Sequence, residues 1–325
     1  MLKVVSINFA YAEKEILQNI SFEVKKGEHL GIIGESGCGK STLLKAIYGL
    51  LDLDSGKIIF KKKKVLGPAY NLVPGVSNMK YLAQEEQLMP FTSVAENITT
   101  HLSRQFPKEN KERLAVLLEV VDMQAYAHKK VKLLSGGQKQ RVALAQVLAK
   151  KPEFLLLDEP FNFIDNFRKN RLRRRLFAYL RRENITCLFA THDATDILGF
   201  SDRVLVVKEG ELLSDKHPKE LIENPPNFYT ASLLSEVNTI DATNFSASKK
   251  GHYLIYPQEI QLSKNGFLQA KVVKNYYNGF NYFVESVLEN SEEKIYFYSE
   301  NVMEQGEICK LTIAKLLLEK RFRSA

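Results

Sequence analysis

The chain has 325 residues, with 46 lysines and arginines against 38 aspartates and glutamates, and a formal net charge of +8. This length allows one large or two modest domains, and a hydrophobic content of 45% supplies a normal core. No apolar run approaches the roughly 18 residues that a membrane-spanning helix needs, and we expect no signal peptide. The composition therefore excludes an integral membrane protein. The scattered cysteines, without metal-ligand spacing, are typical of free thiols in a reducing cytosol.

Much of the positive charge lies in two runs, Lys61–Lys64 and Arg168–Arg175. Such runs can attract nucleic acid or anionic lipid, but they also form ordinary solvated faces. In the second run Leu172, Leu176 and Leu180 recur at helical spacing. We therefore expect a helix that buries one stripe and exposes its arginines.

Strand and helix patterns alternate over the first part of the chain. Ile20, Phe22 and Val24 alternate as in a strand, and residues 41–50 predict a helix that ends near Gly49. Further predicted elements are a strand after Gly56, helices over residues 87–135, a helix over Gly136–Lys150, and apolar strands at Phe154–Leu157 and Thr186–Ala190. Continuous apolar runs are typical of parallel strands that are buried on both faces. The alternation therefore indicates an α/β core.

The composition changes near residues 224–250. Asn224-Pro225-Pro226 and the polar stretch Asn238–Lys250 predict a connector. The strands expected after it are Tyr253–Tyr256, Phe267–Lys274, Phe280–Glu289, Lys294–Tyr298 and Ile308–Ile313. Short strands separated by Asn-Gly and Gln-Gly turns favour a small β-barrel of the OB type.

A glycine-rich segment follows the apolar run Leu30–Ile33. The residues Gly34-Glu35-Ser36-Gly37-Cys38-Gly39-Lys40-Ser41, followed by Thr42, fit the P-loop pattern. Backbone N–H groups of such a loop approach a triphosphate, and the helix that follows adds its positive dipole end. Lys40 would then reach the β- and γ-phosphates of ATP, and Ser41 would ligate Mg²⁺.

Two carboxylates end a later apolar run, Phe154–Leu157. Asp158 stands where a Mg²⁺-coordinating carboxylate of the Walker B kind belongs, and Glu159 follows directly. Two exposed turn carboxylates are the plain alternative, but the strand before them is strongly apolar. We therefore expect both carboxylates to lie beside the phosphate loop.

The run Leu134-Ser135-Gly136-Gly137-Gln138 stands between these two elements. A P-loop, an LSGGQ run and a Walker B strand in this order resemble the ATP-binding subunit of ABC transporters. In that family LSGGQ completes the nucleotide site of the partner subunit. The resemblance therefore implies an ATPase that uses ATP and Mg²⁺, and that clamps ATP in a homodimer or in a pair with a similar ATPase. It also implies a P-loop (RecA-like) core with an antiparallel β subdomain and a helical subdomain at about residues 87–150.

Other family positions can be matched one by one. Glu159 matches the general base that polarises the attacking water, and His192 matches the switch histidine on the γ-phosphate. Gln84 matches the Q-loop glutamine, which touches Mg²⁺ or the water. Asp165 matches the D-loop aspartate that links the two sites, and Tyr11 matches the aromatic residue that stacks on adenine.

Two positions depart from the family pattern. Phe161-Asn162-Phe163-Ile164-Asp165 replaces the usual Leu-Ser-Asn-Leu-Asp of the D-loop, although the aspartate remains. Gln146 stands where the family often has arginine. Because Asp165 remains, we expect the coupling between the two sites to be kept, although the changed neighbours affect its fine tuning. We infer no loss of catalysis from Gln146.

The tail resembles that of an importer-type ATPase. Tyr256-Pro257-Gln258-Glu259-Ile260 resembles the start of a TOBE domain, a transport-associated OB fold that importers for maltose, sulfate, polyamines and ferric iron carry. The resemblance implies an ABC-type nucleotide-binding domain at residues 1–235 and a regulatory TOBE or OB-like barrel at 236–325.

The resemblance also implies partners and a location. The stretch Glu85–Asn97 resembles the segment that faces integral membrane transporter subunits. We therefore expect a peripheral protein on the cytoplasmic face of the membrane. An importer would add a substrate-binding protein, and no nucleic acid is expected.

Two alternatives remain open at this point. One is the ATPase subunit of an exporter. The other is a soluble ABC ATPase with a nucleic-acid-binding OB module, in which exposed aromatic rings would stack on bases. The aromatic residues concerned are Tyr276, Tyr277, Phe280, Tyr282 and Phe283. We expect them instead to be barrel core and turn residues.

Overall fold

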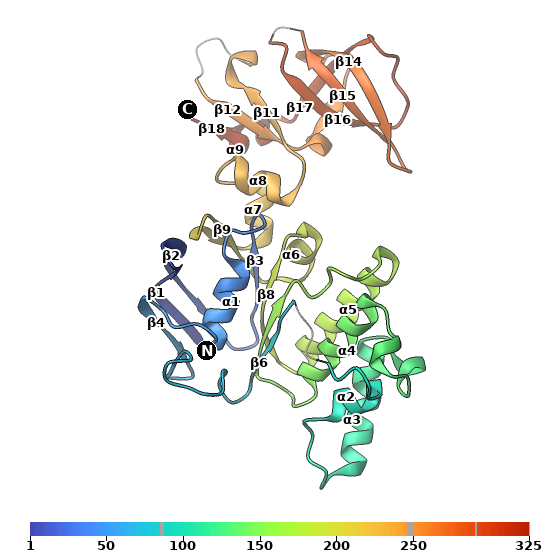
Figure 1. The fold of residues 1–325 in the computed structure, drawn as a ribbon. Helices are drawn as coiled ribbons and strands as arrows, with labels where there is room; N and C mark the ends of the chain where they lie inside the picture. The colour runs from blue at the N-terminus through green and yellow to red at the C-terminus, as the bar shows by residue number, and fades with distance from the viewer. Residues whose placement is uncertain (85–87, 246–249, 290, 325) are drawn as a thin grey trace. The chain divides into compact units, whose positions relative to one another are not determined.

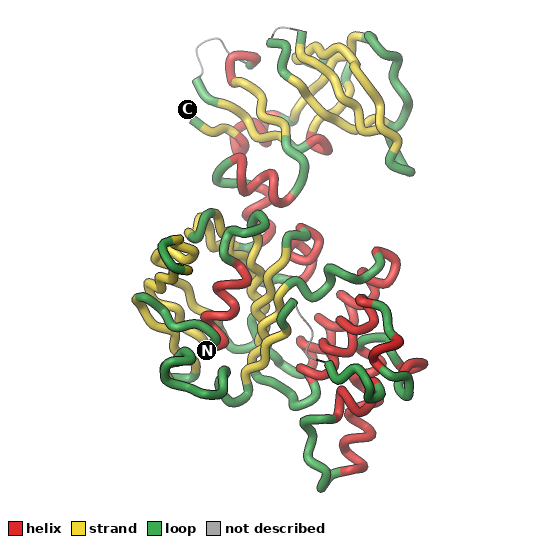
Figure 2. Tube along the Cα trace, viewed as in Figure 1, coloured by secondary structure: helices red, strands yellow, loops and turns green. Residues whose placement is uncertain are grey.

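A computed structural model describes residues 1–84, 88–245, 250–289 and 291–324 (Figures 1 and 2). The chain separates into two compact units, Met1–Pro218 and Lys219–Ala325. The assignment of residues 219–235 to the ATPase domain stays a prediction. Of the predicted docking stretch Glu85–Asn97, residues 85–87 lie outside the described residues. None of the helices in the described part of the chain has the length and apolar character that a membrane crossing requires.

The first unit combines two sheets with a group of helices. Its strands are β1 (Leu2–Tyr11), β2 (Lys14–Val24), β3 (His29–Ile33), β4 (Ser55–Phe60), β5 (Lys63–Val65), β6 (Met79–Leu82), β7 (Phe154–Asp158), β8 (Thr186–Thr191), β9 (Arg203–Lys208) and β10 (Glu211–Lys216). Its helices are α1 (Lys40–Tyr48), α2 (Val94–Thr99), α3 (Pro107–Val120), α4 (Gly136–Leu148), α5 (Asn166–Arg182) and α6 (Ala194–Phe200).

The central sheet has the strand order β10–β9–β3–β8–β7–β6. Strands β9, β3, β8, β7 and β6 are parallel, and β10 pairs with β9 in the antiparallel sense. Every residue of β3, β7 and β8 is buried, as their continuous apolar runs predicted. A separate antiparallel sheet has the order β2–β1–β4–β5. The α/β core and the antiparallel β subdomain of the sequence analysis are therefore confirmed.

Helix α1 lies between the two sheets and joins them into one core (Figure 1). Its residues Leu43, Leu44 and Ile47 are fully buried against side chains of both sheets. The helix ends at Gly49, whose φ of 83° lies in the left-handed region that glycine adopts without strain. The helix predicted for residues 41–50 is confirmed.

The helical subdomain contains less helix than predicted. The predicted helical region at 87–135 holds α2, α3 and the short 3₁₀ turns Gln124–Tyr126 and Val131–Leu133, with loops between them. Helix α2 begins at a capping box of Ser93 and Glu96, and α3 begins with Pro107, so each has its own start signal. Arg113 of α3 donates to the carbonyls of Leu148 and Ala149, which ties α3 to the end of α4.

Helix α5 confirms the predicted apolar stripe, because Leu172, Leu176 and Leu180 are buried. The expectation that all of its arginines are exposed is wrong for Arg173. This side chain is 4% exposed and forms ion pairs with Asp193 and Asp196. Two carboxylates satisfy its buried charge, which a count of apolar spacing could not reveal.

The second unit is mostly β-structure. It contains β11 (Asn238–Asp241), β12 (His252–Ile255), β13 (Ile260–Leu262), β14 (Leu268–Tyr277), β15 (Tyr282–Leu288), β16 (Lys294–Ser299), β17 (Ile308–Ile313) and β18 (Phe322–Arg323), with helices α7 (Pro218–Glu223), α8 (Phe228–Leu234) and α9 (Lys315–Arg321). An antiparallel sheet of order β13–β17–β14–β15–β16 nearly closes, because β13 also approaches β16. The predicted OB-like barrel is confirmed.

Part of the predicted connector is a strand. Residues Asn238–Asp241 form β11, which pairs with β12. Ile240 is buried in the barrel core, and the Asn238 amide exchanges two hydrogen bonds with the backbone of Tyr296, at 2.7 and 2.8 Å. The polar side chain of Asn238 is thus satisfied by hydrogen bonds to another strand, and the polarity of this stretch wrongly suggested a connector. Residues 246–249 of the predicted connector lie outside the described residues.

The prediction for the tail aromatics is wrong in part. Tyr276 and Tyr277 are not core residues but are 42% and 67% exposed on β14, and Phe280 is a turn residue, 96% exposed. Phe283 stacks on Tyr296 with ring centroids 5.4 Å apart. Tyr276 and Tyr277 are the last two residues of β14, and both are exposed, so the alternation of buried and exposed side chains does not continue to the end of this strand.

Candidate active site

The phosphate loop connects β3 to α1. Gly39 has a φ of 107°, and a Cβ there would lie 2.8 Å from the carbonyl oxygen of Ile16. At Gly34 a Cβ would lie 2.2 Å from the carbonyl oxygen of Val207. Lys40 is 5% exposed, and its Nζ donates to the carbonyls of Gly34 and Glu35 at 2.8 Å each. The loop therefore needs glycine at these positions, and it holds the lysine beside the loop backbone.

A cavity of about 480 Å³ opens beside this loop. It is lined by Ile16, Ser36, Gly37, Gly39, Lys40, Ser41, Thr42, Gln84, Gln140, Glu159, Asn162 and Phe163. The fold thus brings the predicted P-loop, the Q-loop glutamine and the predicted general base to one cavity. Its position at the N-terminus of α1 suits an anionic group.

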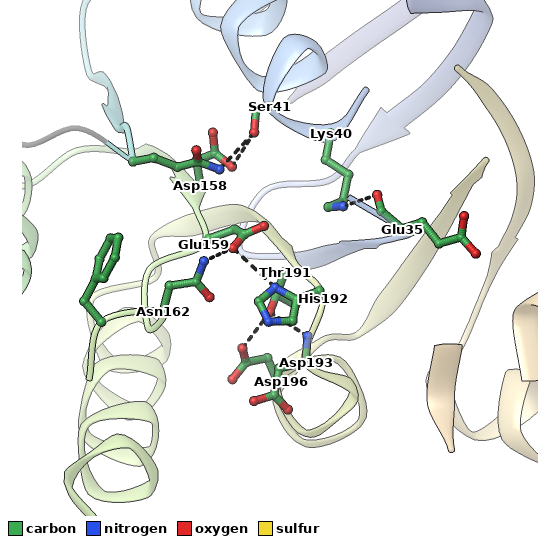
Figure 3. A network of polar contacts seen from close by, with 12 residues as sticks. Glu35, Lys40, Ser41, Asp158, Glu159, Asn162, Thr191, His192, Asp193 and Asp196 are labelled. Atoms are coloured by element: carbon green, nitrogen blue, oxygen red, sulfur yellow. Dashed lines mark hydrogen bonds and ion pairs between the residues drawn. The ribbon is translucent and has the colours of Figure 1, made fainter. Parts of the chain in front are cut away.

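Oxygen atoms suited to a hard cation meet at the edge of this cavity (Figure 3). Ser41 Oγ donates to Asp158 Oδ1 at 2.9 Å, and Gln84 Nε2 donates to Ser41 Oγ at 3.3 Å. Tyr81 OH donates to the second oxygen of Asp158 at 3.1 Å. Burial raises the pKa of Asp158 above its ordinary value, and the hydrogen bonds from Ser41 and Tyr81 oppose this shift. Hydroxyl and carboxylate oxygens fit Mg²⁺, which prefers such ligands.

Glu159 occupies a strained turn directly after β7. Its φ of 48° lies in the left-handed region, which is unfavourable for a residue with a side chain. Its N–H donates to the carbonyl of Ala190 at 2.9 Å, and its own carbonyl accepts from Gln140 Nε2 at 3.0 Å. These bonds hold the backbone, so the side chain has a defined direction toward the cavity.

The Glu159 carboxylate has two side-chain partners (Figure 3). Asn162 Nδ2 donates to Oε2, and His192 Nδ1 lies 3.3 Å from the same oxygen. The carboxylate is only 14% exposed, whereas His192 is 54% exposed. The fold therefore brings the predicted base and the predicted switch histidine into contact.

The turn that carries His192 is anchored from α5. Thr191 Oγ1 donates to Asp196 at 2.8 Å, and Lys169 Nζ donates to Asp193 at 2.9 Å. Arg173 forms ion pairs with both aspartates. The hydrogen bonds from Lys169, Thr195 and Arg173 lower the pKa of Asp193 despite its burial. This network fixes the backbone on both sides of His192.

Four residues of the LSGGQ run, called the signature run from here on, line a second cavity of about 400 Å³. It is lined by Ser135, Gly136, Gly137, Gln138, Arg141, Phe163, Ile164, Asp165 and Arg168. Ser135 caps α4 in a capping box with Gln138, and a Cβ at Gly137 would lie 2.3 Å from the carbonyl oxygen of Phe163. The signature run therefore packs against the D-loop, and none of Ser135, Gly136, Gly137 and Gln138 lines the P-loop cavity of the same chain, whereas Phe163 of the D-loop lines both cavities.

Gln140 lines the P-loop cavity and bonds to the D-loop, and sequence reasoning missed it. It is 5% exposed; its Nε2 donates to the carbonyl of Glu159, and its Oε1 accepts the N–H of Phe163 at 3.2 Å. One side chain of helix α4 thus holds both the turn that carries Glu159 and the D-loop. Its place two residues after the LSGGQ run was the available signal.

Several predicted residues lie outside the P-loop cavity. Tyr11 is the last residue of β1 and is 48% exposed. Its ring packs edge-on against that of Phe9, with the ring centroids 4.7 Å apart. Gly34, Glu35 and Cys38 belong to the loop but do not line the cavity. The adenine-stacking role of Tyr11 stays a prediction.

Cys38 offers a labelling test of the loop. It is 7% exposed, and burial raises the pKa of its thiol. We expect iodoacetamide to label Cys38 slowly in the native chain, because the thiolate is the reactive form. Bound MgATP should slow it further, whereas labelling of Cys187, fully buried in β8, should not change. Mass spectrometry of the labelled peptides measures both rates; equal Cys38 labelling with and without MgATP would contradict its place in the phosphate loop.

Comparisons with known proteins agree with this site. A family model described as ABC transporter matches residues 17–162. The spermidine/putrescine import ATP-binding protein PotA of Pasteurella multocida is 36% identical, over 75% of this chain and 65% of its own length. The Fe(3+) ions import ATP-binding protein FbpC 2 of Haemophilus influenzae is 32% identical, over 81% of this chain and 80% of its own length. PotA of Shigella boydii is 30% identical, over 92% of this chain and 86% of its own length.

Solved structures give the same result for the fold. A dimeric ATP-binding cassette in a post-hydrolysis state, bound to ADP and Pi, has a TM-score of 0.59 and 25% identity, over 67% of this chain and 99% of that one. CbiO1 from Clostridium perfringens, part of an ABC transporter complex, has a TM-score of 0.59 and 29% identity, over 68% and 90%. The chain belongs to the ABC transporter family as one of its ATP-binding subunits, and it is an ABC-type ATPase.

Proposed function

We propose that this chain is the ATP-hydrolysing subunit of an ABC importer, and that it works as a dimer on the cytoplasmic face of a membrane. One observation carries the proposal. Residues of the P-loop and Glu159 line one cavity, and Asp158 is hydrogen-bonded to Ser41 at its edge, whereas the signature residues line another cavity. A single copy thus holds two half-sites, and a second copy in head-to-tail orientation would complete both.

The chemistry follows from the residues around the P-loop cavity. Lys40 would exchange its bonds to the loop carbonyls for bonds to the β- and γ-phosphates. Glu159 would accept the proton of the attacking water, with its direction set by Asn162 and His192. His192 would contact the γ-phosphate from the same side and so report its presence.

Ser41, Asp158 and Gln84 would hold Mg²⁺ at the edge of this cavity. When bound there, Mg²⁺ would supply positive charge that offsets the negative charge of the triphosphate. Asp165 lines the signature cavity and would contact the phosphate loop of the partner copy. We infer that it links hydrolysis at the two composite sites.

Similarity to import proteins supports the proposed import direction and the proposed partners. A polyamine importer subunit and a ferric iron importer subunit are 36% and 32% identical to this chain. Relatives with such different cargoes match almost equally well, so we assign cargo choice to membrane subunits and a substrate-binding protein. The exporter alternative has no comparable support.

A basic cavity lined by residues of β6 and α4 is our candidate contact for the membrane subunits. It has a volume of about 410 Å³ and includes Lys80, His101 and Lys150 among otherwise apolar and neutral lining residues. Burial and the charges of Lys150 and Lys80 lower the pKa of His101. Such a cluster would accept an acidic side chain of the partner.

Purification of the chain from native membranes tests this function. We expect integral membrane subunits to co-purify with it, and their removal to change its ATPase rate. Fractionation of the chain with ribosomes or DNA, without any membrane subunit, would overturn the transporter proposal.

A second candidate function has one observation in its favour. Tyr276, Tyr277 and Phe280 are exposed, and Lys274 Nζ lies 4.8 Å from the ring centroid of Tyr276. Exposed rings beside lysines on an OB-like sheet are typical of single-strand binding.

Oligonucleotides separate the two functions. We expect single-stranded DNA and RNA to leave the ATPase rate unchanged, because the tail of a transport subunit has no nucleic-acid task. The measurement is steady-state phosphate release by the full chain with and without oligonucleotide. Strong stimulation that is lost in Tyr276→Ala but kept in Tyr70→Ala, an exposed tyrosine outside the barrel, would establish the nucleic-acid function instead.

A further inference from the structure

Two hydroxyl groups hold the two carboxylate oxygens of Asp158. Ser41 Oγ donates to Oδ1 at 2.9 Å, and Tyr81 OH donates to Oδ2 at 3.1 Å. Ser41 belongs to the P-loop, whereas Tyr81 belongs to none of the motifs that the sequence showed. We propose that Tyr81 is a positioning residue that orients Asp158 toward the Mg²⁺ of MgATP, an inference that rests on the ATPase function proposed above.

The sheet geometry brings these groups together. Strands β6 and β7 are parallel neighbours, with Tyr81 paired to Leu156 and Leu82 to Leu157. Successive side chains of a strand point to opposite faces, so Tyr81, Leu156 and Asp158 share one face of the sheet. Tyr81 and Leu156 pack in the core that contains α1, and Ser41 lies in the first turn of that helix. The two hydroxyls therefore reach Asp158 from two different elements.

The Tyr81 ring is held in place by its surroundings. It packs against Tyr48 with ring centroids 5.6 Å apart and an interplanar angle of 40°. Packing on one side and the hydrogen bond at its end leave the hydroxyl little freedom. The contact to Asp158 is thus a fixed feature of the site.

Asp158 depends on this contact because it is only 1% exposed. In the part of the chain that the structure describes, Tyr81 is the one donor to its Oδ2. Without that bond the buried oxygen would lose its partner. The carboxylate could then rotate away from the orientation in which its other oxygen accepts the hydrogen bond from Ser41. Groups that orient a metal ligand in this way commonly change metal affinity by about 10–100-fold when they are removed.

The test compares Tyr81→Phe with the wild-type full chain in the presence of AMP-PNP. Mn²⁺ serves as the probe, and electron paramagnetic resonance measures its binding. We expect the dissociation constant of Mn²⁺ to rise about tenfold. The affinity for the fluorescent nucleotide TNP-ATP in EDTA should stay unchanged, because Tyr81 does not line the P-loop cavity.

Steady-state ATPase gives a second readout. The Mg²⁺ concentration for half-maximal rate should rise by a similar factor in Tyr81→Phe, and saturating Mg²⁺ should restore kcat to within about twofold. A merely structural role would lower kcat at all Mg²⁺ concentrations. Such a uniform loss would overturn the proposal.

Tyr48→Phe is the matched control, since it removes a hydroxyl from the ring that packs on Tyr81 and leaves both bonds to Asp158 in place. Equal Mn²⁺ affinity in wild type and Tyr81→Phe, or the same loss in Tyr48→Phe, would overturn the positioning role. A wild-type chain that binds neither nucleotide nor Mn²⁺ would instead refute the ATPase function itself.

Discussion

Glu159→Gln should abolish steady-state ATP hydrolysis and leave ATP binding intact. The amide has the size of the carboxylate but cannot accept the proton of water, so a rate loss of about 10²–10⁴-fold is expected. The strained turn should survive, because its backbone bonds to Ala190 and Gln140 do not involve the side chain. Phosphate release measures the rate, and size-exclusion chromatography with MgATP should show an accumulated dimer.

Glu153→Gln is the control for this substitution. Glu153 lies at the other end of the same strand and contacts Lys61 and Asn78. We expect it to keep the wild-type rate. Hydrolysis by Glu159→Gln at close to the wild-type rate would mean that another group is the general base.

The turn that carries Glu159 illustrates what sequence could predict about this site. The P-loop and the two carboxylates Asp158 and Glu159 at the end of β7 were predictable because each motif is local, and the strand that leads into it fixes where it lies. The contact between Glu159 and His192 required an inferred register between β7 and β8, which lie side by side in the sheet. Neighbouring parallel strands end at one edge, so that inference had a physical basis.

The supporting residues could not be predicted in the same way. Gln140, Arg173 and Tyr81 each reach the site through a long side chain from a neighbouring element. Apolar periodicity places helices and strands but says nothing about which polar side chain is buried between them. Arg173 lies in a charge run that suggested a solvated face, and only its pairing with Asp193 and Asp196 explains its burial.

The fold shows the same limit at Asn238. Its polar neighbours predicted a connector, whereas it begins β11, which pairs with β12, and its side-chain amide exchanges two hydrogen bonds with the backbone of Tyr296. Strand pairing depends on a partner that is distant in sequence, so local composition could not indicate it. The barrel itself was predictable, because turn residues and alternation repeat along the tail.

Ser135→Arg should block ATP hydrolysis without weakening ATP binding by the single copy. Ser135 lines the signature cavity and not the P-loop cavity, so the arginine would fill only the half-site offered to the partner. Dimer closure with MgATP should be lost, because a bulky side chain occupies the place of the partner's γ-phosphate. TNP-ATP binding measures the first property, and chromatography in the Glu159→Gln background measures the second.

The substitution also removes a helix cap, and Ser93→Arg controls for that loss. Ser93 caps α2 with Glu96 in the same way as Ser135 caps α4 with Gln138. Loss of either cap costs about 1 kcal/mol of stability, so both variants should melt at similarly reduced temperatures. Only Ser135→Arg should lose ATPase activity and dimer closure. Full activity in that variant would show that the signature run does not act on the partner's nucleotide, because a filled half-site cannot close on a triphosphate.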